Sequence, residues 1–546
     1  MPPGNAAERP VKLWQVILAI VGVVFLALGS HWIRIAELPK QELWLDAGGC
    51  HTPMTVLDPP ADVKPAGSVV LLHGLSANRR LMMYLAEDFA GHGFRAYALD
   101  LPGHGDSPDA FSFAHAQDCA TATVESLIHS GQLDPKSTIL LGHSMGAAIA
   151  IRMADRDPVA ATIALSPAPM NGPQRMPANL LVFSASADLG ILKRVAQGLS
   201  DAADGERIAP EDFLQQRAFE LRRLPRSTHT SLLSDRRVAH DSEKWAMQTL
   251  FPDIAADTLT LNLDLATYET FGKGRRRLAG GVLGFLGILL LFPMVVSVSA
   301  KFAAPSASTN ATDEPGAVAA THGAASQIGS PGNHPSARLL LSEGALCAML
   351  GVLVLVLGVP LKFLHLYTGA YLASLLLIVG ILLLIFNFGF AMEYASLHIK
   401  PLAVAAILGF ATFLALGAWM NWQLDDAWLN APRWLRFAGL LPFTWIYCFA
   451  EEVTLGPVHH GLERTVRFAV FLLLRLELFL ACTLAWYLFA SGQVLIPLLF
   501  VYLALFSILQ RLATDALRVR ARSATAAALF GAILASWFIA GVFPLT

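Results

Sequence analysis

Apolar residues in this chain form runs of two lengths, which occupy different parts of the sequence. Between residues 42 and 252 the runs are short, rich in Val, Ile, Leu and Ala, and separated by polar stretches. Before residue 32 and after residue 277 they are long enough to cross a bilayer. Short apolar runs bounded by turn residues are typical of buried strands, whereas the long runs are typical of membrane helices.

The short runs predict an α/β domain over residues 32–252. Helix-forming stretches lie between them, and alternation of strand and helix is the order of a doubly wound, mostly parallel sheet. The expected strands are residues 68–72, 95–99, 139–141, 161–165, 180–184 and 218–224.

The long runs predict one N-terminal membrane helix and about eight C-terminal ones. The first, residues 13–31, follows Arg9 and Lys12 and is interpreted as an uncleaved anchor, although cleavage as a signal peptide near Ala27 to Ser30 stays open. The C-terminal spans are expected near residues 278–298, 339–359, 366–391, 401–420, 437–455, 468–490, 493–510 and 524–544.

These elements give five parts in order along the chain. They are a polar tail (1–12), the N-terminal anchor (13–31), the α/β domain (32–252), a linker (253–277) and a polytopic helical membrane domain (278–546) with a flexible loop over 300–337. Composition agrees, because 55% hydrophobic residues, a mean hydropathy of +0.52 and 15% charged residues indicate a soluble domain joined to a membrane domain. The lipid bilayer is therefore an expected partner.

Charge and cysteine content narrow the function classes. A net charge of -2 and the lack of a basic patch with interleaved aromatic residues argue against nucleic acid as a partner. The five cysteines show neither metal-ligand nor disulfide-like spacing, so they do not indicate a redox compartment. No cofactor or metal is implied.

Basic clusters give conflicting indications of membrane orientation. Lys273 to Arg277 and Arg511 to Arg522 are separated by seven expected spans, which places the clusters on opposite sides of the membrane. Either the long soluble domain crosses the membrane regardless of its flanking charge, or one of the expected spans is not a membrane helix. The expected span with the weakest support is 437–455, because Pro442 interrupts it. We favour nine spans with the α/β domain outside the cytoplasm.

One motif of the sequence is typical of a catalytic nucleophile. The apolar run at 139–141 leads into Gly142-His143-Ser144-Met145-Gly146, and small helix-forming residues follow. A serine on such a tight strand-to-helix turn takes a strained backbone, which the flanking glycines permit, and its hydroxyl projects over the sheet edge. The pattern predicts that Ser144 is a nucleophile.

Two further motifs occur upstream in the same order as in a known superfamily. Leu71-Leu72-His73-Gly74-Leu75 and Asp100-Leu101-Pro102-Gly103-His104-Gly105-Asp106-Ser107 each follow an expected strand. With the Ser144 motif they resemble the α/β-hydrolase superfamily, closest to its monoglyceride-lipase-like and serine-aminopeptidase-like branch, over about residues 42–252. Many relatives insert a helical lid between the strands that correspond to 161–165 and 180–184. The short connection here implies a minimal cap and an open site, unless residues 190–218 or the membrane helices cover it.

The other members of a catalytic triad are expected after Ser144, since the chain order in this fold is serine, acid, histidine. Asp188 follows the expected strand 180–184 and is the candidate acid. His229 follows the strand 218–224, where the resemblance places the base, whereas the competitor His240 falls on an expected amphipathic helix. Asp100 and Asp106 precede the serine and do not fit the order.

The fold also predicts an oxyanion hole of two backbone N–H groups, those of Leu75 and Met145. His73, His104 and His143 belong to loop motifs and lack zincin spacing, so they are expected to be structural.

The helical half resembles no family that we recognise. It contains ionisable residues whose burial within a membrane span would cost free energy. Buried charges within membrane spans tend to pair, which predicts an ion pair between Arg475 and Glu451 or Glu452. A functional role and a purely structural pair both stay open, as they do for His459 and His460.

The sequence as a whole predicts a membrane-embedded serine hydrolase that cleaves a carboxylic ester, or less readily an amide, through an acyl-enzyme. The membrane tether and minimal cap favour a lipidic or acyl substrate. Two alternatives remain: a transporter, flippase or membrane scaffold with an accessory hydrolase domain, and an acyltransferase that uses the same triad.

Overall fold

A computed structural model describes most of the chain. The described residues are 13–34, 39–61, 63–253, 276–292, 295, 337–395, 397–423, 428–455, 464–489, 496, 499–521 and 523–546. The predicted tail, linker and loop therefore lie almost wholly outside the described residues, as do His459 and His460.

The chain forms two compact units. The first contains Met1–Val24, Leu286–Leu416 and Trp434–Ala540, and the second contains Phe25–Phe285, Gly417–Arg433 and Gly541–Thr546. We call them the helical unit and the sheet unit. The domain boundaries expected from the sequence stay a prediction.

The sheet unit is built on one eight-stranded sheet with the strand order β1-β2-β4-β3-β5-β6-β7-β8. Strands β3 to β8 pair in parallel, and β1 and β2 join the β4 edge as an antiparallel pair. The strands are β1 (Gln41–Ala47), β2 (Cys50–Leu57), β3 (Gly67–Leu72), β4 (Phe94–Leu99), β5 (Thr138–His143), β6 (Ala161–Leu165), β7 (Leu180–Ala185) and β8 (Phe219–Leu224). The mostly parallel sheet expected from the sequence is thus present.

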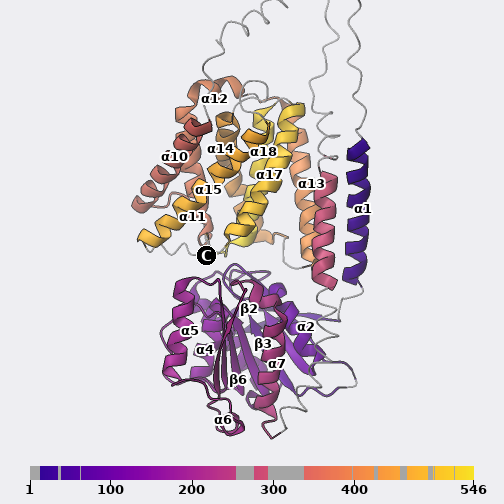
Figure 1. Ribbon diagram of the computed structural model, residues 1–546, viewed down its shortest axis with the longest axis vertical. Helices are drawn as coiled ribbons and strands as arrows, with labels where there is room; N and C mark the ends of the chain where they lie inside the picture. The colour runs from indigo at the N-terminus through magenta and orange to yellow at the C-terminus, as the bar shows by residue number, and fades with distance from the viewer. Residues whose placement is uncertain are drawn as a thin grey trace, which may run out of the picture. The chain divides into compact units, whose positions relative to one another are not determined.

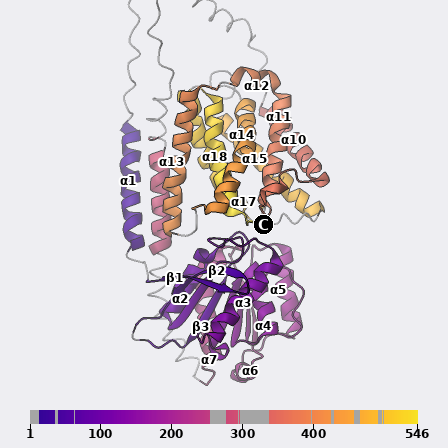
Figure 2. The same cartoon turned by 180° about the vertical axis from the view of Figure 1, so that it is seen from behind.

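Helices flank the strands on both sides (Figures 1 and 2). They are α2 (Met83–Gly91), α3 (Phe113–His129), α4 (Met145–Arg156), α5 (Gly190–Ala202), α6 (Pro210–Leu214) and α7 (Arg236–Leu250). Alternate residues of one strand serve two cores: Leu181 and Phe183 of β7 lie in the core with α2 and α7, and Leu180 and Val182 lie in the core with α4 and α5. Because both faces are buried, these strands are continuously apolar.

A disulfide joins Cys50, at the start of β2, to Cys119 of α3. This corrects the conclusion from spacing alone, which found no disulfide-like pattern. The two cysteines are 69 residues apart, and only the fold brings the strand beside the helix, so chain spacing carries no signal of the pairing.

The helical unit contains several long apolar helices. The described helices of the C-terminal half include α10 (Ala337–Leu357), α11 (Gly369–Phe386), α12 (Phe388–Tyr394), α13 (Ile399–Gln423), α14 (Ala431–Thr454), α15 (Arg464–Phe489), α17 (Phe500–Ala521) and α18 (Ala524–Val542), and the N-terminal helix is α1 (Leu13–Arg34). Among the described residues, six helices are long and apolar enough to cross a membrane, in α1, α10, α11, α13, α15 and α18. The number of spans stays a prediction.

Charged side chains are buried between α14, α15 and α17 of the helical unit. Arg475 of α15 donates to both carboxylate oxygens of Glu451, at 2.5 and 2.6 Å, which confirms the predicted pairing. Glu452 accepts instead from Arg511 at 2.7 Å and from Arg518 at 2.6 Å. Helices α14 and α17, which carry most of these charges, are not among the six candidate spans.

Candidate active site

Ser144 occupies the sharp turn that the sequence predicts between β5 and α4. Its backbone angles are φ 53° and ψ -112°, a conformation that is costly for a residue other than glycine. The turn closes only because Gly142 and Gly146 lack side chains: a Cβ on Gly142 would lie 2.2 Å from the Gly146 oxygen, and one on Gly146 would lie 2.1 Å from the Leu72 oxygen. The Ser144 N–H donates to the Leu165 carbonyl of β6 at 2.8 Å, which fixes the turn against the sheet.

Asp188 and His229 meet at the carboxyl ends of β7 and β8. Nδ1 of His229 lies 2.8 Å from Oδ1 of Asp188, and both residues are buried. The two strands run parallel, so the loops that follow them leave the sheet at the same edge as the Ser144 turn. The structure thus brings the predicted acid and base together.

A third residue, Ser166, which was not predicted from the sequence, also contacts the carboxylate. Its hydroxyl donates to Oδ2 of Asp188, and the Ala185 N–H donates to the same oxygen at 3.3 Å. Burial disfavours the charged carboxylate, but the hydrogen bonds from His229 and Ser166 outweigh it, so the pKa of Asp188 is lowered. The place of Ser166 directly after β6, at the same sheet edge, is the signal that could have found it.

His143 supports the backbone of His229. Its Nε2–H donates to the His229 carbonyl at 3.1 Å, and the two ring centroids are 4.7 Å apart. Burial, with the neighbouring His229 as a further cause, lowers the pKa of His143 to about 3, so this imidazole stays neutral. Ser144 and His229, both within the described residues, make no direct side-chain hydrogen bond. Such bonds are often long in the absence of substrate.

The two predicted oxyanion donors lie on either side of Ser144. Met145 opens α4, where backbone N–H groups have no acceptor within the helix. Gly74, which precedes Leu75, approaches so closely that a Cβ there would lie 3.2 Å from the Ser144 Cβ. Neither the Leu75 nor the Met145 N–H donates a hydrogen bond within the part of the chain that the structure describes.

The loop histidines form hydrogen bonds with backbone atoms. Nδ1 of His73 donates to the Gly74 carbonyl at 2.8 Å, and Nε2 accepts from the Leu101 N–H at 3.0 Å. Burial lowers the pKa of His73 to about 4. His104 donates to the Pro102 carbonyl at 2.8 Å, and burial lowers its pKa as well. These contacts agree with the structural roles expected from the sequence.

The loop after β4 is fixed from two directions. Asp100 pairs with Arg79 and also accepts from the backbone N–H groups of Arg79 and Asp106, at 2.8 and 3.0 Å, which gives it a structural position before the serine. On the other side of the loop, the Gly103 carbonyl accepts from the guanidinium of Arg433 at 2.9 Å and from the Leu545 N–H at 3.1 Å. Both donors belong to the sheet unit although they lie late in the chain.

The competitor His240 lies on α7, as the sequence analysis expects. Its Nδ1 is 3.3 Å from Oδ1 of Asp241 on the same helix.

Two groups within the described residues have the donor types and closeness of a metal site, and neither includes the triad. One is Cys50, Asp109, His115 and Cys119, whose two sulfurs are joined in the disulfide. The other is Asp88, His92 and Glu243, in which Nδ1 of His92 lies 2.9 Å from Glu243.

One segment of the chain is similar to a known protein family. Residues 69–293 match the model of the alpha/beta hydrolase family. The AB hydrolase superfamily protein YisY of Bacillus subtilis is 33% identical over 91 residues, which are 17% of this chain and 33% of that protein. The dihydrolipoyllysine-residue acetyltransferase component of the acetoin cleaving system of Pseudomonas putida is 30% identical over 143 residues, 26% of this chain and 34% of that protein. The chain therefore spans about a third of the length of these curated relatives.

Solved structures also match part of this chain. An α/β serine hydrolase without a lid from Xanthomonas campestris is 20% identical, with a TM-score of 0.31, over 39% of this chain and 94% of that one. The esterase Pf2001 of Pyrococcus furiosus is 14% identical, with a TM-score of 0.32, over 39% of this chain and 94% of that one.

Proposed function

Residues 69–293 form a segment of the α/β-hydrolase superfamily, and from this premise we propose that the protein is a membrane-embedded serine hydrolase that cleaves a carboxylic ester. The observation that carries the proposal is the buried pair of Asp188 and His229, 2.8 Å apart, at the sheet edge that also holds the strained Ser144 turn.

In the proposed mechanism, Ser144 Oγ attacks the ester carbonyl. With its Nδ1–H donated to Asp188, His229 presents an unprotonated Nε2, which accepts the serine proton and then passes it to the departing alcohol. The N–H groups of Leu75 and Met145 stabilise the negative oxygen that develops. Water then attacks the acyl-enzyme, His229 accepts its proton, and the carboxylic acid leaves as Ser144 Oγ is protonated again.

A lipidic or acyl-bearing substrate is favoured by two features. The connection between β6 and β7 contains only residues 166–179, which leaves little chain for a cap. Among the described residues, six helices are compatible with a multi-pass membrane protein, so esters dissolved in the bilayer are the nearest supply of substrate. The acceptor of the acyl group is proposed to be water. An alcohol acceptor would use the same residues, and product analysis with competing alcohols distinguishes the two.

The sheet unit is proposed to lie outside the cytoplasm. The disulfide between Cys50 and Cys119 supports this side, because disulfides persist in oxidising compartments and are rare in the cytosol. A reporter fused within residues 303–337 tests the topology: nine spans put this loop, one span after the sheet unit, on the cytoplasmic side. An external signal would contradict it.

The test of the catalytic residue is labelling with a fluorophosphonate, which reacts only with an activated serine. We expect wild-type protein and a Ser130→Ala control, which removes an exposed hydroxyl, to be labelled equally. Ser144→Ala should remove the label. Label that persists in Ser144→Ala contradicts the assignment.

The substrate class is tested separately. Wild type and Ser144→Ala are compared on p-nitrophenyl esters, monoacylglycerols, lysophospholipids and aminoacyl amides. We expect turnover of the acyl esters by wild type alone. Turnover confined to the amides would make the protein a peptidase.

A further inference from the structure

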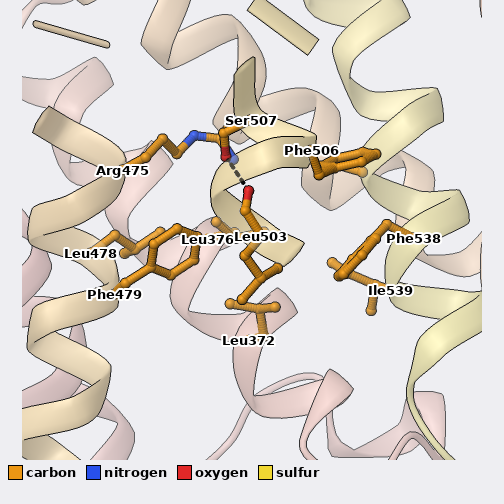
Figure 3. Close-up of a pocket in the computed structure, with 11 residues that line it drawn as sticks. Leu372, Leu376, Arg475, Leu478, Phe479, Leu503, Phe506, Ser507, Phe538 and Ile539 are labelled. Carbon is orange, nitrogen blue, oxygen red and sulfur yellow. Dashed lines mark hydrogen bonds between the residues drawn. The ribbon is translucent and has the colours of Figure 1, made fainter. Parts of the chain in front are cut away.

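A groove in the helical unit has apolar walls and one cationic end (Figure 3). Helices α11, α15, α17 and α18 line it, with Leu376, Phe479, Leu503 and Ile539 among the wall residues. Part of the space between these walls is open to the outside of the unit. Apart from Arg475 and Ser507, every side chain that lines it is apolar.

Arg475 keeps donor capacity at the end of this groove. Its Nε and Nη2 donate to Glu451, and Nη2 also lies 3.3 Å from the Gln510 side-chain oxygen. Within the described residues its Nη1 makes no hydrogen bond. Figure 3 shows the Arg475 side chain beside Ser507, whose hydroxyl donates to the Leu503 carbonyl at 2.8 Å.

The charges behind Arg475 do not balance. The buried cluster contains four arginines and three carboxylates, which are Arg467, Arg475, Arg511, Arg518, Glu451, Glu452 and Asp515. Counted over the residues that the structure describes, it therefore carries one surplus positive charge. A buried charge without a counter-charge is costly, so a site of this kind favours an anion.

The surplus is most evident at Arg467, on the same helix as Arg475. Arg467 is 1% exposed, and its nearest carboxylate, Asp515 at 3.6 Å, also pairs with Arg511. Its Nε and Nη1 are buried and have no hydrogen-bond partner in the described chain. The guanidinium groups of Arg475 and Arg511 both lie over the ring of Phe471, at 5.2 and 5.3 Å from its centroid.

We propose that this groove binds a single-chain anionic amphiphile, a long-chain carboxylate, with its alkyl chain along the apolar wall and its head at Nη1 of Arg475. A carboxylate supplies the one negative charge that the cluster lacks and accepts hydrogen bonds from a guanidinium. An alkyl chain matches walls built from Leu, Phe and Ile. The site lies within the helical unit and does not depend on the hydrolase assignment.

The test measures binding to the full-length Ser144→Ala protein by native mass spectrometry from detergent. The probes are dodecanoate, dodecanol and dodecyl phosphate, which share one chain length and differ only in the head. We expect dodecanoate to bind one per chain and dodecanol to bind at least about tenfold more weakly, the loss of one charged contact.

Two variants locate the site. Ala535→Phe places a ring in the groove and should weaken dodecanoate binding at least about tenfold. The matched control, Leu480→Phe, adds the same ring at a position that is 56% exposed and does not line the groove, and it should bind like the parent. The paired change Arg475→Met with Glu451→Gln removes the head contact without leaving one buried charge alone.

The outcomes separate cleanly. Equal binding of dodecanol and dodecanoate, or unchanged binding in Ala535→Phe, overturns the proposal. Tighter binding of dodecyl phosphate by about tenfold or more would assign the groove to a phosphate-headed lipid instead. Because every measurement uses Ser144→Ala, a failure here leaves the fluorophosphonate result untouched, and the reverse also holds.

Discussion

At the scale of single residues, the positions of the triad candidates could be proposed from local sequence rules and, for His229, from the family resemblance, while their catalytic roles stay a prediction. Ser144 is marked by glycines that a tight turn requires, and Asp188 and His229 by their places after successive strands. Ser166 could not be predicted in the same way, because a serine after a strand is common and its contact with Asp188 depends on how two loops pack.

Ser166 is expected to act as a positioning residue. Ser166→Ala removes a hydrogen bond to the ionised carboxylate, so kcat/KM should fall by about tenfold or more. The pKa of Asp188 should rise, because one of the bonds that lower it is gone, and the acid limb of the pH–rate profile should move to higher pH. An unchanged profile in Ser166→Ala would contradict this role.

His73 is expected to make the sheet unit sensitive to acid. Its pKa is about 4 in the folded protein and near 6.5 when exposed. Between these values the unfolded chain binds a proton that the folded protein does not, so the free energy of unfolding falls as the pH falls from 6.5 towards 4. His73→Gln, which keeps one donor and one acceptor, should show a smaller drop in melting temperature between pH 7.5 and pH 5. An equal drop would exclude His73 as a source of the acid sensitivity.

At the scale of elements, the apolar parallel strands were predictable and the β1–β2 pair was not. β6 was expected at the residues where it occurs, because a strand buried on both faces is a continuous apolar run. β1 is an exposed edge strand with no clear alternation, and β2 contains Pro53 and several polar residues. Their pairing depends on the neighbouring strand β4 and the helix α3.

The disulfide is the covalent link between this pair and α3. Replacing Cys50 and Cys119 together by alanine should lower the free energy of unfolding of the sheet unit by about 2–4 kcal/mol, since the loop it closes is long. Thermal melting of the double variant, compared with wild type before and after treatment with a dithiol reductant, measures the effect. If reductant lowers the melting temperature of the double variant as much as that of wild type, the disulfide is not the cause.

At the scale of the whole molecule, the late segments of the chain that join the sheet unit were beyond prediction. Arg433 precedes an expected membrane span and Leu545 follows the last one, and nothing in their local sequence indicates contact with residue 103. Their hydrogen bonds to Gly103 arise only when the chain returns to the sheet unit after its helices.

Arg433 is expected to support activity through the Gly103 loop. It donates to the carbonyls of Gly103, Gly541 and Phe543, and the same loop meets His73 through the Leu101 N–H. Arg433→Ala should lower kcat/KM on a p-nitrophenyl ester by about tenfold, with partial rescue by Arg433→Lys. Arg156→Ala, which removes an exposed arginine of the same unit, is the control. Equal activity of Arg433→Ala and Arg156→Ala would contradict the role.

The hydrogen bonds of Leu545 have a consequence for biosynthesis. A ribosome makes the eight strands of the sheet unit well before Leu545, the residue that closes the Gly103 loop. Nascent chains, and fragments that stop before residue 545, would carry Ser144 without the hydrogen bonds between Leu545 and the Gly103 loop. The Gly103 loop would then reach its final contacts only after the helices of the C-terminal half have been translated.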